Sequence, residues 1–112
     1  MTEVILRENS IVCMGNPLLD ISASVKADLL TKHQLKANDA ILTESEEIFR
    51  DLIGEYKESV EYIAGGATQN STRVAQWILG KPNVTAYMGC VGDDENRKIL
   101  EEKATNAGVN VK

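Results

Sequence analysis

The sequence predicts an α/β fold in which helices flank a parallel sheet, together with a smaller patch of half-exposed strands. Two observations lead to this prediction. After Val60 the pattern alternates strand, helix, strand, helix and strand, which is the order that builds a parallel sheet from βαβ units. The other observation is a set of short segments with one apolar and one polar face, near 21–25, 40–43 and 60–63.

Start and stop signals set the expected limits of the remaining elements. Helical spacing of apolar residues is found at 28–35, at 44–57, from Thr68 to Gly80, and from the Gly92-Asp93 turn to Gly108. Further strands are expected at 11–14, 84–91 and 109–111. The first of these is a continuous apolar run, which indicates a strand buried on both faces.

Particular side chains make these expectations specific. Thr43 and Glu46 have the spacing of a capping box, so Thr43 is expected to cap the helix at 44–57. The helix that follows the double glycine is expected to bury a stripe through Val74 and Ile78, and Trp77 is expected in a core or an interface. The single histidine, His33, is expected at the surface or at a helix end.

Composition narrows the class of protein. The chain has 112 residues with ordinary globular proportions, 43% hydrophobic and 26% charged, and a formal net charge of −5. An acidic surface argues against nucleic acid as a partner, and no apolar run is long enough for a membrane span. Cys13 and Cys90 lie in apolar runs without a metal-type spacing, so we expect two buried thiols and a cytoplasmic protein.

The first motif with chemical potential is the segment from Gly15 to Asp20. It follows an expected strand, and open α/β sheets bind ligands beyond the carboxyl ends of their strands. The Asp20 carboxylate accepts two hydrogen bonds at once, which suits the two adjacent hydroxyls of a ribose, and Asn16 adds a donor and an acceptor. The alternative is that both side chains only stabilise the Asn-Pro turn.

The second motif is the double glycine at 65 and 66. Paired glycines allow a backbone to approach a ligand closely, and the helix that follows presents free N–H groups at its start, with Thr68 as the expected cap. Asn70 lies within the first turn of this helix. The alternative is a helix start that needs glycine for packing alone. The segment from Gly89 to Asp94 is interpreted as a tight turn with Asp93 or Asp94 as a helix cap.

Three stretches carry a family resemblance. Residues 14–21, residues 61–71 with 74–77, and residues 89–92 closely resemble the first strand and turn, the double-glycine loop and helix, and the next strand end of eukaryotic adenosine kinases. These kinases form part of the ribokinase-like (PfkB) superfamily. The match runs in order over nearly all of the chain.

The resemblance implies a ribokinase-like fold, a large α/β domain with a small lid of β-strands, of which residues 1–112 are only the N-terminal part. It implies ATP-dependent phosphorylation of adenosine at the 5′-hydroxyl to AMP, in purine salvage, with Mg²⁺. Carried over by position, the implied substrate-binding residues are Asp20, Asn16, Gly65, Gly66 and Asn70 around the ribose and Leu18, Ala40 and Leu42 near the base.

Several departures from the family accompany the resemblance. Ala67 stands where a serine is frequent and Ala40 where a glutamine is common. The Gly-Ala-Gly-Asp loop that carries the family's general base does not occur, so no catalytic residue and no metal ligand are expected here, and the chain alone is expected to be inactive. The resemblance further implies that the full-length protein is a monomer. It also implies a cytoplasmic location, with the nucleus as a second expected location.

Two other functions stay open at this point. One is another ribokinase-like kinase that acts on a different nucleoside or sugar. The other is a short, non-catalytic nucleoside-binding module.

Overall fold

The computed structural model describes residues 4–112 and divides the chain into two compact units. We call them the sheet unit, made of the residues up to Asp20 together with Tyr62–Lys112, and the insert unit, Ile21–Glu61. Within residues 4–112, no helix is both long enough and apolar enough to cross a membrane.

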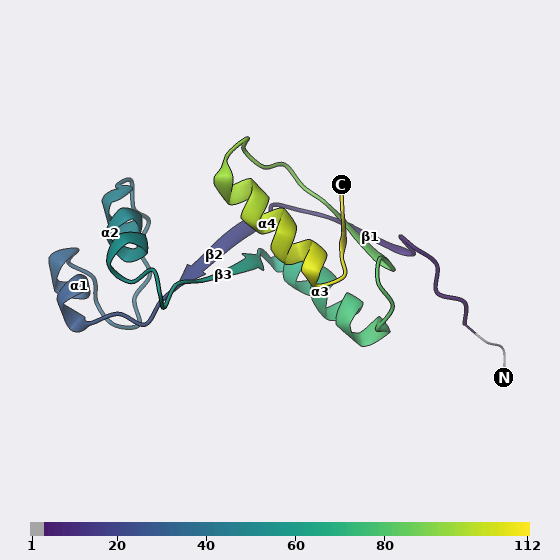
Figure 1. Cartoon of the computed structure of the whole chain (residues 1–112), viewed down its shortest axis with the longest axis horizontal. Helices are drawn as coiled ribbons and strands as arrows, with labels where there is room; N and C mark the ends of the chain where they lie inside the picture. Colours follow the sequence, from purple (N-terminus) through teal and green to yellow (C-terminus); the bar gives the residue numbers. More distant parts are fainter. Residues whose placement is uncertain (1–3) are drawn as a thin grey trace. The chain divides into compact units, whose positions relative to one another are not determined.

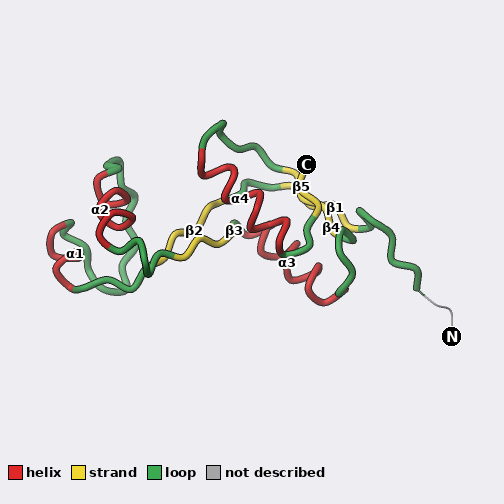
Figure 2. The backbone as a smooth tube through the Cα atoms, in the orientation of Figure 1, coloured by secondary structure: helices red, strands yellow, loops and turns green. Residues whose placement is uncertain are grey.

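The sheet unit contains the parallel sheet that the sequence predicts. Its strands are β1 (Ile11–Met14), β4 (Thr85–Met88) and β5 (Asn110–Val111), parallel and in the order β1-β4-β5. Figure 2 shows these three strands side by side. Two further strands, β2 (Leu18–Ser22) and β3 (Glu61–Gly65), pair in a separate two-stranded sheet. The predicted α/β class with a parallel sheet is confirmed.

Two helices of the sheet unit, α3 (Ala67–Leu79) and α4 (Glu95–Asn106), pack on one face of the parallel sheet (Figure 1). Tyr87 and Val111 are register partners on this face, and they line one cavity together with residues of both helices. The opposite face presents Val12 and Met14, which are 57% and 76% exposed. The expectation that β1 is buried on both faces is therefore wrong, because α3 and α4 cover only one face of this sheet.

The buried face of α3 is polar, which the periodicity of apolar residues did not indicate. Gln69, Thr72 and Gln76 are the buried residues of this helix. Val74, Trp77 and Ile78 are 52%, 80% and 73% exposed, so the predicted apolar stripe is on the wrong face. For Thr72 and Gln76 the cause is that their side chains have hydrogen-bonding partners inside the unit, so their burial costs little.

The Gln76 carboxamide is the clearest example. Its Oε1 accepts hydrogen bonds from the backbone N–H of Thr85 (3.0 Å) and from the Thr85 hydroxyl (2.9 Å). Its Nε2 donates to the carbonyl of Lys81 at 2.6 Å. One side chain thus joins α3, the loop after it and the first residue of β4.

The ends of both helices follow the expected stop signals. Gly80 closes α3 in the left-handed conformation, and Gly108 (φ 84°) follows α4. Asp94 caps α4 by accepting a hydrogen bond from the Arg97 N–H at 2.9 Å, as one of the two expected caps. Lys98 pairs with Glu95, three residues before it on the same helix.

The insert unit consists of α1 (Ala27–Lys32) and α2 (Glu47–Glu55) with connecting loops. The strand expected at 21–25 lies earlier, as β2, because the chain is already extended directly after Pro17. The segment 40–43 is irregular, so the strand expected there is wrong. The third expected strand, 60–63, is β3 and extends to Gly65.

The capping box expected at Thr43 does not form. The Thr43 hydroxyl accepts a hydrogen bond from the Ser45 N–H and donates to the Ser45 carbonyl, so it stabilises a local turn. As a result, α2 begins at Glu47, three residues later than expected.

A charged contact connects the two helices of the insert unit. The Asp51 carboxylate on α2 lies 2.5 Å from the Lys32 ammonium and 2.8 Å from His33 Nε2 at the end of α1. The hydrogen bond from Lys32, followed by that from His33, lowers the pKa of Asp51 below its usual range. His33 therefore has the helix-end position that the sequence predicted.

We expect Gln76→Leu to lower the free energy of unfolding by about 1–3 kcal/mol, because the buried Thr85 N–H loses its acceptor. Urea unfolding followed by circular dichroism measures the change. Trp77→Leu is the matched control on the same helix. Its side chain is 80% exposed, so its effect should stay within about 0.5 kcal/mol. Equal effects of the two substitutions would contradict the role of Gln76.

Asp51→Asn should destabilise the insert unit in a pH-dependent way. A carboxylate with a lowered folded-state pKa stabilises the fold above its unfolded pKa of about 3.9, and this contribution is lost as the pH falls through the folded value. The difference in thermal midpoint between wild type and variant should thus be present at neutral pH and disappear in acid. A difference that is constant with pH would show that the ion contacts contribute nothing.

Candidate functional site

The candidate site lies at the carboxyl end of β1, where the chain turns into β2. This turn packs against the first turn of α3 and the end of β4. A β-carbon built on Gly15 would lie 2.6 Å from the Thr68 hydroxyl oxygen, and one built on Gly89 would lie 2.8 Å from Cδ of Pro17. Neither position has room for a larger side chain, so the turn is held close to both elements.

Asp20 and Gly65 face each other on β2 and β3. A β-carbon on Gly65 would overlap the Asp20 carboxylate, with Oδ2 as its nearest atom. The carboxylate thus lies directly over the bare Cα of Gly65. Asp20 itself is exposed to solvent, so its two oxygens are accessible to a ligand.

Gly66 is required for a different reason. It is the N-cap of α3 with φ 95°, a conformation that side chains rarely adopt, and a β-carbon there would lie 2.6 Å from the carbonyl oxygen of Asn16. Thr68, the expected cap, lies inside the first turn of the helix instead. The double glycine therefore lies against both Asn16 and Asp20, which is close packing within the protein, and its contact with a ligand stays a prediction.

The first turn of α3, which follows the double glycine, has backbone N–H groups that are not bonded within the helix. Asn70 N–H donates to the Gly66 carbonyl at 2.8 Å and closes the first turn, so the three N–H groups before it have no partner within the helix. The Asn70 side chain is exposed. A helix start of this kind favours acceptor atoms or negative charge on a ligand.

Six of the eight predicted substrate-binding residues belong to the sheet unit, and two belong to the insert unit. The structure brings Asn16, Asp20, Gly65 and Gly66 into contact, with Leu18 beside Gly66 and Asn70 one turn further. Ala40 and Leu42 are in the irregular segment of the insert unit, where Leu42 is 97% exposed. Their proximity to a base stays a prediction.

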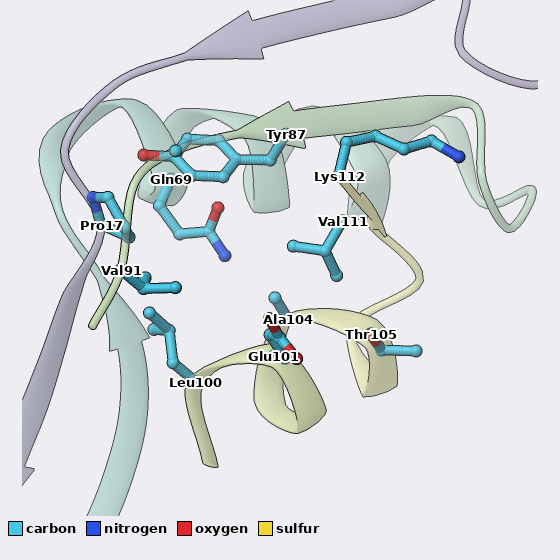
Figure 3. A pocket seen from close by; sticks show the side chains of 11 residues that line it. Pro17, Gln69, Tyr87, Val91, Leu100, Glu101, Ala104, Thr105, Val111 and Lys112 are labelled. Carbon is cyan, nitrogen blue, oxygen red and sulfur yellow. The ribbon is translucent and has the colours of Figure 1, made fainter. Parts of the chain in front are cut away.

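A cavity that the sequence did not indicate lies behind the turn, between α3, β4 and α4 (Figure 3). It has a volume of about 270 Å³. Its lining residues are Pro17, Gln69, Tyr87, Gly89, Val91, Leu100, Glu101, Ala104, Thr105, Val111 and Lys112. The available signal was the polar spacing 69, 72 and 76 on α3, which marks one helical face but is usually assigned to solvent.

The cysteines and potential metal ligands add little to the site. Cys13 is half-buried and Cys90 is exposed, so the expected burial of the Cys90 thiol is wrong. Among residues 4–112, no three histidine, cysteine, aspartate or glutamate side chains come together in a way that could hold a metal ion.

Comparison with known families identifies the chain at the level of its family. The sequence pattern of the pfkB family carbohydrate kinases matches residues 28–112. The chain belongs to this family. The match covers most of the insert unit and of the sheet unit after β2, including the double glycine and the whole of α3.

Curated relatives of this pfkB family chain are adenosine kinases. Adenosine kinase 2 of Arabidopsis thaliana is 53% identical over 98 residues, which cover 88% of this chain and 28% of the plant protein. The adenosine kinase of Dictyostelium discoideum is 48% identical over 100 residues, covering 88% and 29%. The chain therefore spans less than a third of the length of the relatives it matches.

Solved structures agree on the fold. An adenosine kinase of Anopheles gambiae, in complex with a di(adenosine-5) tetraphosphate, matches with a TM-score of 0.74 and 54% identity over 95% of this chain and 33% of that one. The apo adenosine kinase of Trypanosoma brucei brucei matches with a TM-score of 0.79 and 38% identity, over 89% and 31%. The predicted ribokinase-like fold is confirmed.

The contact between Asp20 and Gly65 gives a sharp test of the site. Gly65→Ala should displace the Asp20 carboxylate, and a ligand that this carboxylate holds should then bind about ten-fold or more weakly, since each charge-assisted hydrogen bond contributes about 1.5–3 kcal/mol. Isothermal titration calorimetry with adenosine measures the loss.

Gly54→Ala is the matched control. Gly54 lies in α2 with nothing within 4 Å of the added β-carbon. That substitution should leave adenosine affinity unchanged and stabilise the helix by about 0.5–1 kcal/mol. Unchanged affinity in Gly65→Ala would remove Asp20 from the site.

Proposed function

We propose that this chain is the nucleoside-binding part of an adenosine kinase, which transfers the γ-phosphoryl group of ATP to the 5′-hydroxyl of adenosine and yields AMP. The observation that carries the proposal is the Asp20 carboxylate lying over the bare backbone of Gly65, next to the left-handed Gly66 at the start of α3. The similarity to adenosine kinases at about half sequence identity supports the choice of substrate.

Asp20 has the chemistry to hold a ribose. Its two oxygens accept hydrogen bonds side by side, and the 2′- and 3′-hydroxyls of a ribose present two donors at a matching separation. The bare Cα atoms of Gly65 and Gly66 admit the Asp20 carboxylate and the Asn16 carbonyl, which keeps the two motifs together beside the start of α3. Asn16 and Asn70 can then bond to the remaining sugar oxygens from the two sides of the loop.

Hydrogen bonds between Asp20 and the ribose position the substrate but do not take part in the phosphoryl transfer itself. Phosphoryl transfer depends on placing the nucleophile in line with the γ-phosphorus and on stabilising charge around the transferring group. Asp20 fixes the ribose and so orients the 5′-hydroxyl. We propose that ATP, Mg²⁺ and the general base act through residues other than those described here, so the isolated chain binds adenosine without phosphorylating it.

A chimera tests the proposal as an enzyme. Residues 1–112 replace the corresponding N-terminal segment of the Anopheles gambiae adenosine kinase, with which they share 54% identity. We expect the chimera to convert adenosine to AMP with ATP, and the isolated chain to show no turnover. A chimera that phosphorylates a different nucleoside or a free sugar far faster than adenosine would overturn the substrate assignment in favour of another kinase of the family.

Within the chimera, Asp20→Asn should lower kcat/KM for adenosine by about 10- to 100-fold, because the amide replaces one charge-assisted acceptor by a donor. Steady-state kinetics with adenosine as the varied substrate measure the loss. Glu102→Gln, an exposed carboxylate on α4, is the matched control and should change nothing. Wild-type kinetics in Asp20→Asn would refute the ribose role.

A further inference from the structure

The cavity behind the nucleoside loop has walls that differ from those of the candidate site. Its apolar walls are the Tyr87 ring on the sheet, Leu100 and Ala104 on α4 and Val111 on β5, and polar groups form nearly as much of the lining. Pro17 closes the side nearest to the loop (Figure 3). A concave, mainly apolar space with a few convergent polar groups is the usual form of a small-molecule site.

Two buried polar atoms of the cavity wall have no hydrogen-bond partner among the described residues. They are Oε1 of Gln69, a residue that is 1% exposed, and the hydroxyl of Tyr87, a residue that is 2% exposed. Figure 3 shows the Gln69 carboxamide pointing into the space between Leu100 and Val111. Since buried polar groups are nearly always hydrogen-bonded, these atoms indicate a ligand that supplies a donor.

We propose that this cavity binds a small, uncharged heteroaromatic molecule whose ring N–H donates to Gln69 Oε1. An apolar protein cavity of about 150 Å³ accommodates benzene, so the volume of about 270 Å³ has room for two fused rings. The Tyr87 ring offers a surface for aromatic packing.

Charge at the mouth of the cavity favours a neutral ligand. The lining includes one acid and one base, Glu101 and Lys112, and Glu101 already accepts a hydrogen bond from Arg97 at 2.9 Å. The opposite charges of Glu101 and Lys112 leave the lining without a net charge that would attract an ionised ligand.

The proposed site is separate from the ribose grip and does not depend on the proposed kinase function. Asp20, Gly65 and Gly66 do not line the cavity. The two sites are neighbours, since Pro17 follows Asn16 and lies beside Gly66, and Gln69 precedes Asn70. Competition with adenosine therefore distinguishes a ligand in the cavity from one in the nucleoside site.

The test uses the 112-residue chain and two probes, benzimidazole and 1-methylbenzimidazole. Both are neutral fused rings of similar size, but only the first has a ring N–H. We expect benzimidazole to bind, as measured by ligand-observed NMR titration, and the methylated probe to bind about ten-fold more weakly, because it leaves Gln69 Oε1 unpaired. Excess adenosine should not displace benzimidazole.

Variants separate the hydrogen bond from folding. Gln69→Leu removes the acceptor and should abolish the preference for the N–H probe. Thr105→Phe fills the mouth from an exposed position of α4 and should abolish binding, whereas Asn106→Phe, which is also exposed but does not line the cavity, should leave it intact.

Three outcomes would overturn the proposal. Absence of binding by either probe at millimolar concentration would mean that the cavity holds water only. Equal affinities of the two probes in the wild-type chain would exclude the bond to Gln69. Loss of benzimidazole binding in Asp20→Asn, or its displacement by adenosine, would place the probe in the nucleoside site.

Discussion

The sheet unit depends on the three hydrogen bonds of one buried carboxamide. Gln76 bonds to the first residue of β4 through both the backbone and the side chain of Thr85, and to the loop carbonyl of Lys81. Gly108, with φ 84°, approaches the same side chain from the end of α4, where a β-carbon would lie 3.3 Å from Gln76 atoms. The position of α3 against β4 is thereby fixed, and with it the start of α3, which carries the double glycine.

The candidate site uses this rigidity with very few side chains. Asp20 supplies charge, while Gly65 and Gly66 supply space, and each glycine is required by a different neighbour, a carboxylate in one case and the Asn16 backbone in the other. A site formed mainly by backbone leaves little to adjust when the ligand binds, so its geometry is preorganised by the sheet unit itself. Because so few residues form the site, two short motifs were enough to predict it from the sequence.

The order of strands and helices after Val60 was predictable, because apolar runs and glycine stop signals act locally. Burial was predicted less well, since it depends on partners distant in sequence. Gln69 and Gln76 look like solvent-facing residues until β4 and the α3–β4 loop are in place. Val12 looks like a core residue although it lies on the face of the sheet that α3 and α4 do not cover. The segment 40–43 has the composition of a strand, yet strand formation requires a neighbouring strand and none pairs with it among residues 4–112.

The pairing of β1 with β4 has a consequence for synthesis on the ribosome. The partner of Ile11 is Thr85, so the first strand to emerge has no sheet neighbour until Thr85 has been synthesised. Strands that pair over such a long sequence separation fold slowly, because the entropy cost of closing the loop comes before any stabilising contact forms. During that interval Val12 and Met14 belong to an unpaired apolar segment, the kind of exposed stretch that favours aggregation.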